Sequence, residues 1–98
     1  MIEYLIEIRL PEIFSEHFIS LIPKQREMVN RLMLKGIILS YALSLESRKL
    51  WVTMFADSEE TVKRHMMEFP VYDYINFAMH KLTFHNNVKL GLPQISLN

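Results

Sequence analysis

Two polar patterns in this sequence could carry acid–base chemistry. Glu7 and Arg9 lie two residues apart in an alternating segment, so their side chains share one face of a strand. There the carboxylate could act as a base and the guanidinium could anchor an anion. His80 shares a strand face with Asn76, and an imidazole in an enclosed cavity could act as an acid or a base near neutral pH. The plainer interpretations are a cross-strand ion pair and a half-buried structural histidine.

Aromatic side chains could form the walls of a ligand pocket. The candidates are Tyr41, Trp51, Tyr72 and Tyr74. Their rings would supply apolar surface, and the tyrosine hydroxyls would orient a polar ligand. Ordinary core and dimer packing would use the same residues, and Trp51 could do both. The segment 72–74 follows a helix and a proline, so it could instead only shape the start of the last strand.

The sequence does not favour metal, nucleotide or hydrolase chemistry. None of its four histidines is spaced three or four residues from another, and there is no cysteine, so we expect no metal site. A glycine-rich phosphate loop and the serine elbow of hydrolases are also missing from the sequence.

The charge balance argues against nucleic acid as a partner. Eleven basic and eleven acidic residues give a formal net charge of zero, and no basic cluster exceeds two adjacent residues. Zero net charge also gives little repulsion between copies, which favours self-association. The first residues lack a signal-peptide profile, and no apolar run approaches the roughly 20 residues that cross a bilayer. We therefore expect a cytoplasmic protein with no membrane contact.

Hydrophobic periodicity predicts the first half of the fold. Residues 2–10 alternate as in a strand, which Pro11 ends because it has no N–H to donate. Residues 15–35 follow helical spacing, and Pro23 either kinks one helix or begins a second. Gly36 stands where a helix C-cap is expected.

The second half follows the same logic. Residues 37–45 and 49–56 read as the two strands of a hairpin. A second helix is predicted to start at Asp57, as N-cap of a capping box with Glu60, and to stop before Pro70. Residues 74–84 form the predicted fourth strand.

The order β-α-β-β-α-β predicts an α+β fold of the ferredoxin-like βαββαβ plait type. Such a fold has a four-stranded antiparallel sheet with two helices on one face. The other sheet face would carry Trp51, Phe55 and Leu82 beside a few polar groups. An exposed patch of this kind marks a contact surface or a ligand site. Two such sheets packed face to face would close a dimeric α+β barrel around an enclosed space.

Residues 1–85 are assigned to this single domain, and residues 86–98 to a C-terminal extension. The apolar residues of the extension alternate: Val88, Leu90, Leu92, Ile95 and Leu97. We expect the extension to add to a sheet edge or to pack on the domain or a partner subunit. The alternative is a disordered terminus.

Several short segments, taken in order, resemble the muconolactone isomerase family of dimeric α+β barrels. They are Arg9-Leu10-Pro11, Gln25-Arg26-Glu27, Arg31-Leu32, Gly36, residues 68–74 (EFPVYDY) and Leu82-Thr83-Phe84-His85. The resemblance spans about residues 2–85. It implies a small enzyme without metal or organic cofactor that moves a double bond of an unsaturated lactone by shifting a proton. It also implies sheet-to-sheet dimers that form larger rings, with the pocket between the sheet and the first helix or a partner subunit.

One position departs from the family pattern. The family carries a glutamate on the first helix, before a basic residue, as its proton carrier, and the matching positions here hold Gln25 and Arg26. An amide cannot accept a proton near neutral pH. Glu27 lies two positions on, about 200° around the helix, and faces elsewhere. Either Glu27 or Glu7 serves as the base, or this chain does not catalyse that reaction.

The leading hypothesis is a muconolactone-isomerase-like protein that binds a small unsaturated carboxylated metabolite in an intersubunit pocket. Its reaction, if it has one, would be a proton-shift isomerisation with Glu27, Glu7 or His80 as the catalytic group. The residues expected to bind the substrate are Arg26, Arg9, Trp51, Tyr41, Tyr74 and Asn76. The alternatives on the same scaffold are a non-catalytic small-molecule-binding domain and an oligomerisation module. Each implies a dimer or higher homo-oligomer.

Overall fold

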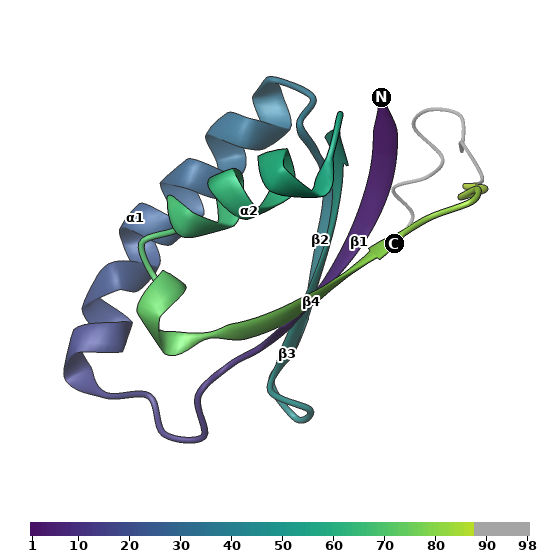
Figure 1. Ribbon diagram of the computed structural model, residues 1–98. Coiled ribbons are helices and arrows are strands. Elements are labelled where there is room, and N and C mark those ends of the chain that lie inside the picture. The colour runs from purple at the N-terminus through teal and green to yellow at the C-terminus, as the bar shows by residue number, and fades with distance from the viewer. Residues whose placement is uncertain (88–98) are drawn as a thin grey trace, which may run out of the picture.

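A computed structural model describes residues 1–87 and shows four strands and two helices in the order β1-α1-β2-β3-α2-β4. Their bounds are β1 Ile2–Arg9, α1 Glu16–Leu34, β2 Ile38–Ser44, β3 Lys49–Ala56, α2 Glu59–Met67 and β4 Asn76–Lys81. Both helices lie on one face of the sheet and leave the other face open (Figure 1). Neither helix is long and apolar enough to span a bilayer.

The sheet has the strand order β2-β3-β1-β4, and every neighbouring pair is antiparallel. The two central strands, β3 and β1, come from different halves of the chain. The sheet therefore alternates between the halves, with β3 of the second half between β2 and β1 of the first. This topology confirms the predicted ferredoxin-like plait. The extension from residue 88 onward lies outside the described residues.

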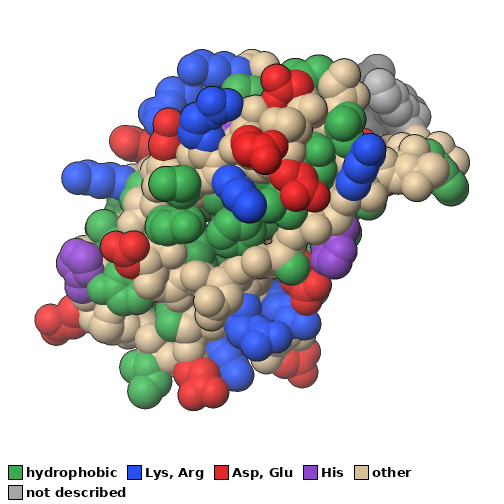
Figure 2. All heavy atoms as spheres, viewed as in Figure 1, with side chains coloured by type: hydrophobic (Ala, Val, Ile, Leu, Met, Phe, Trp, Pro, Cys, Tyr) green, Lys and Arg blue, Asp and Glu red, His purple; other side chains and the backbone are tan. Residues whose placement is uncertain are grey.

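The core lies between the helices and one sheet face, because alternate residues of each strand point to that face. On β1, Tyr4, Ile6 and Ile8 are buried, while their neighbours Leu5 and Glu7 are only partly covered. The other buried contributions are Ile38, Val52, Met54 and Ala56 from the sheet and Met28, Val29, Leu32, Val62 and Met66 from the helices. Figure 2 shows further hydrophobic side chains gathered between the helix layer and β4.

The structure corrects one predicted helix boundary and decides between the two alternatives for Pro23. Pro23 lies inside α1, so residues 16–34 form a single helix. The N-cap of α2 is Ser58 and not Asp57, because the Ser58 hydroxyl accepts the backbone N–H of Thr61 at 3.3 Å. The Asp57 carboxylate instead accepts a hydrogen bond from the Thr61 hydroxyl. Both residue types cap helices well, so the pattern alone could not separate neighbouring positions.

The fourth strand is shorter than the predicted range 74–84. Tyr72–Tyr74 forms a 3-10 turn, in which the N–H of Tyr74 donates to the carbonyl of Val71 at 2.9 Å. The aromatic, β-prone composition of this segment favours a strand, but the turn is what joins α2 to β4. The strand therefore begins only at Asn76.

Gly36 ends α1 in a Schellman motif. Its φ is 75°, its N–H donates to Met33 O at 3.0 Å, and the N–H of Ile37 donates to Leu32 O at 2.9 Å. A Cβ at this position would meet no atom within 4 Å, so a substitution would cost only conformational energy. We expect Gly36→Ala to lower the free energy of unfolding by about 1 kcal/mol, measured by urea denaturation.

Gly36→Asn is the matched control for this backbone effect. Asparagine tolerates the left-handed conformation better than alanine does, so its loss should be smaller. Equal losses for the two variants would contradict a conformational cause.

Candidate functional site

The sheet separates the sequence-predicted site residues into two groups on opposite faces. The register places Glu7 beside Trp51 on one side and Ala78 on the other, and it pairs Arg9 with Asn76 and Leu5 with His80. Glu7, Arg9, Trp51, Asn76 and His80 therefore all lie on the open face. Tyr41 pairs with Val52, a core residue, and so lies on the helix-covered face.

On the open face, Glu7 is the centre of a small charged cluster. Its carboxylate lies 2.9 Å from the Lys49 ammonium and 4.0 Å from the His80 imidazole. The hydrogen bond from Lys49 and the charge of Lys49, helped by His80 and Arg9, lower the pKa of Glu7 below its ordinary value. Glu7 is therefore a carboxylate at neutral pH, but a weaker base than a glutamate whose pKa is raised by burial.

The lowered pKa of Glu7 gives a pH-dependent contribution to stability. Because the folded-state pKa lies below the unfolded value, the contribution is present above the unfolded pKa and is lost as the pH falls through the folded pKa. We expect the Glu7 carboxyl carbon, followed by NMR, to titrate below an ordinary glutamate. Lys49→Met should raise this midpoint, and an unchanged midpoint would mean that Lys49 does not hold the carboxylate.

A second candidate site lies on the other side of the sheet, between α1 and the end of the β2–β3 hairpin. This α1–β2 groove has a volume of about 360 Å³. Its lining is Leu10, Phe14, Phe18, Ile22, Gln25, Arg26, Val29, Tyr41, Leu43, Leu45, Leu50 and Val71. Leu43 and Leu45 are 54% and 63% exposed, which are large values for leucines. Leu43 lies on the helix side of β2, and Leu45 directly follows the end of that strand. Exposed apolar surface of this kind is typical of a contact surface or a ligand groove.

The groove exists partly because β2 carries an irregularity. The pairing of β2 with β3 shifts between Ile38 and Ser40, so the strand gains one residue there. The shift places Tyr41 opposite Val52 and Leu43 opposite Leu50, on the helix side of the sheet. These side chains lie on the edge strand, where α1 leaves them exposed.

Gln25 is the polar group that distinguishes this groove. Its Oε1 accepts a hydrogen bond from the backbone N–H of Val71 at 3.3 Å. Its Nε2 is buried and has no hydrogen-bond partner among residues 1–87. A buried donor without a partner costs about 1–3 kcal/mol, so it calls for a physical explanation. An acceptor supplied by a ligand would remove that cost if the amide turned toward the groove, because Nε2 has no exposed surface in this conformation.

The other predicted residues lie around the groove or away from it. Arg26 and Tyr41 line it. Tyr74 does not line the groove but packs edge-to-face on the Phe18 ring at 5.3 Å, and its hydroxyl lies 2.6 Å from His17 Nδ1. Glu27 is exposed on α1 and lines neither the groove nor the open-face cluster. The groove in which Arg26 lies is therefore lined by none of the predicted catalytic groups, which are Glu7, Glu27 and His80.

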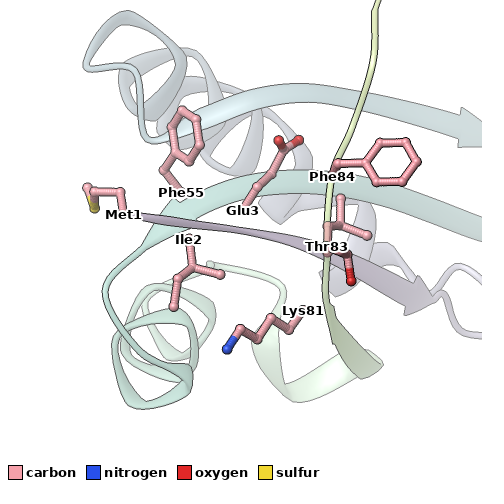
Figure 3. A pocket seen from close by; sticks show the side chains of 8 residues that line it. Met1, Ile2, Glu3, Phe55, Lys81, Thr83 and Phe84 are labelled. Carbon is pink, nitrogen blue, oxygen red and sulfur yellow. The ribbon is translucent and has the colours of Figure 1, made fainter.

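A third hollow, of about 540 Å³, lies at the opposite end of the sheet. Figure 3 shows Glu3 and Phe55 on one side of β1 and Ile2 and Lys81 on the other, so this hollow bends around the sheet. The Glu3 carboxylate is already paired with His85 Nδ1 at 2.6 Å. Lys81 and Thr83 also line this hollow, but among the described residues no buried polar atom without a partner does so.

Within residues 1–87, no three His, Asp or Glu side chains come together as a metal site. No known protein family matches the chain, and no curated protein matches it either. The resemblance to the muconolactone isomerase family therefore stays a prediction. In the sequence, Gln25 stands out only because it matches the position of the family's glutamate. Nothing in the sequence indicates the hydrogen bond between Gln25 and Val71.

Proposed function

We propose that this protein binds a small apolar molecule carrying a carboxylate in the α1–β2 groove, without converting it. The observation that carries the proposal is the buried Gln25 Nε2, which has no partner among the described residues. Nε2 has no exposed surface in this conformation, so a ligand carboxylate would accept its hydrogen bond after the Gln25 amide turns toward the groove. Hydrogen bonds to a charged group contribute about 1.5–3 kcal/mol each, enough to fix the orientation of a small ligand.

Charge and surface type in the groove favour the same ligand class. Arg26 is the single charged residue of the lining, and it supplies the cation that a carboxylate needs. The remaining lining is almost entirely aliphatic and aromatic, apart from the Tyr41 hydroxyl. The ligand therefore has an apolar, unsaturated or aliphatic body and one acidic end in the groove.

The composition of the groove supports binding rather than proton-shift isomerisation. Its lining contains no carboxylate and no histidine, so it presents no side chain that could take a proton from carbon at neutral pH. The position that the resemblance assigns to the family's acid is the amide of Gln25. The missing base therefore favours a binding domain on this scaffold.

Calorimetric titration in heavy water would test this function. The probes are aromatic and unsaturated aliphatic carboxylic acids, each compared with its methyl ester, with NMR of the ligand for deuterium entry. We expect the acids to bind and their esters to bind at least about tenfold more weakly, with no deuterium entering the ligand carbons. Deuterium entry would show that the protein removes protons from carbon and would contradict binding without conversion, and equal binding of acid and ester would exclude the carboxylate site.

A second proposed function is pairing of two copies through the open sheet face. Neighbouring positions across the centre of that face are Ala42, Trp51, Glu7 and Ala78, so the large Trp51 ring stands between the small Ala42 side chain and Glu7, and Glu7 is followed by the small Ala78. Leu5 and Phe55 extend the apolar surface on the same side. A surface of alternating large and small side chains can interlock with its own copy across a two-fold axis.

Sedimentation would test the pairing. We expect wild type to sediment as a dimer and Trp51→Glu to sediment as a monomer, because the new carboxylates would be buried against each other. Ile19→Glu, on the exposed side of α1, is the control and should remain dimeric. A monomeric wild type at high protein concentration would end the proposal.

A further inference from the structure

A separate hollow at the β2–β3 turn is lined by three basic side chains. This turn hollow has a volume of about 300 Å³ and is lined by Arg9, Leu10, Glu12, Ser47, Arg48 and Lys49. Three cations and one carboxylate give its lining a formal charge of 3 − 1 = +2, although the whole chain is neutral. Figure 2 shows Lys and Arg side chains gathered at this end of the molecule, with acidic side chains beside them.

Two of the three cations have no carboxylate partner in residues 1–87. Lys49 pairs with Glu7, but no carboxylate oxygen of these residues lies within 4.0 Å of the guanidinium of Arg9 or Arg48. Glu12 also lines the hollow without forming an ion pair there. Two guanidinium groups and the Ser47 hydroxyl at one hollow form a donor set that suits a carboxylate or phosphate.

Backbone hydrogen bonds fix the turn that carries Arg48. Arg48 has a φ of 52°, in the left-handed region that few side-chain-bearing residues adopt. Its N–H donates to Leu45 O at 3.2 Å, and its carbonyl accepts the N–H of Leu10 at 2.9 Å. The Ser44 hydroxyl accepts the N–H of Ser47 at 3.1 Å. The base of the Arg48 side chain is therefore held in place before any ligand arrives.

The turn hollow and the α1–β2 groove are separate hollows that meet at one residue. Leu10 lines both, and two further groove residues, Leu45 and Leu50, flank the turn residues 46–49 in the chain. Gln25 and Arg26 thus lie among apolar side chains in the groove, and Arg48 lies in the hollow on the other side of Leu10. One elongated ligand could contact both cationic ends at once.

We infer that the molecule bound in the groove is a dicarboxylate, with one acid at Gln25–Arg26 and the other at Arg48–Arg9. This inference rests on the proposed function and narrows its ligand class. The apolar body lies against Leu10, Leu45 and Leu50, and the second carboxylate enters the turn hollow. Glu12, which lines the same hollow, weakens the binding of the second carboxylate, because like charges at one site repel.

The test is calorimetric titration of the full chain with α,ω-dicarboxylic acids of increasing length, each compared with the monocarboxylic acid of the same length. We expect one length to bind at least about fivefold more tightly than its monoacid, the gain of one partly exposed ion pair with Arg. Arg48→Asn should remove most of this advantage and leave the monoacid affinity unchanged. Asparagine suits the left-handed backbone at this position, so the turn is retained.

Two further variants sharpen the result. Glu12→Gln should strengthen dicarboxylate binding and leave monoacid binding unchanged, a gain that damage to the fold would not produce. Arg31→Asn, which removes the same charge from an exposed site on α1, should change neither. Equal affinity of diacid and monoacid for wild type would overturn the inference and leave the proposed function standing. Binding of neither acid would overturn both.

Discussion

Gln25→Glu should weaken the binding of a carboxylic acid by at least about tenfold. The variant exchanges the Nε2 donor for a carboxylate oxygen, so it removes a hydrogen bond to a charged group, which contributes about 1.5–3 kcal/mol, and adds charge repulsion. The other oxygen of the introduced carboxylate can still accept the N–H of Val71, and the urea midpoint of the variant would report the cost of the buried charge. Isothermal calorimetry on the two proteins would measure the difference.

Asn30→Asp is the matched control for Gln25→Glu. It also converts an amide into a carboxylate on α1, but at an exposed position that does not line the groove. Its effect on binding should be smaller than that of Gln25→Glu, because the new charge is exposed one helical turn from Arg26 and is screened there by solvent and salt. Similar losses in both variants would mean that the net charge of α1 governs binding, and the specific role of Gln25 would be wrong.

Ile6→Ala should lower the free energy of unfolding by about 2–5 kcal/mol. Ile6 is completely buried and lies on the central strand β1, between Val52 of β3 and Met79 of β4. Truncation would leave a cavity beneath both helices, and a domain of this size has only about 5–15 kcal/mol of total stability. The loss should appear as a lower urea midpoint with an unchanged slope.

Ile19→Ala provides the comparison for the core substitution. Ile19 lies on α1 and is 51% exposed, so its truncation should change the unfolding free energy by about 0.5 kcal/mol or less. If Ile6→Ala were as mild as this control, β1 would not lie at the centre of the sheet. The ferredoxin-like arrangement would then be wrong.

The fold could be predicted from the sequence because its signals are local. The alternation of β1 and the Gly36 stop of α1 each depend on residues close in the chain, and both agree with the structure. The N-cap at Ser58 and the 3-10 turn before β4 were missed. There two physically acceptable local choices compete, and tertiary packing selects between them.

The candidate site was less predictable because it depends on contacts between distant segments. Gln25 and Val71 are 46 positions apart, and no periodicity reports their hydrogen bond. The shift between Ile38 and Ser40 decides the face on which Tyr41 lies, and the β2 sequence contains no turn signal for it. Alternation pairs Glu7 with Arg9 and Asn76 with His80, and only the strand register shows that all four lie on the face opposite the groove.

The most direct test of the groove as the ligand site is an NMR titration of 15N-labelled protein with a small carboxylic acid. The side-chain NH2 signals of Gln25, assigned by their loss in Gln25→Glu, and the backbone amide of Val71 are the reporters. We expect both to shift with the same dissociation constant, because one amide group joins the ligand to Val71. Shifts confined to the open face, at Trp51 and His80, would contradict the groove and place the ligand between paired sheets.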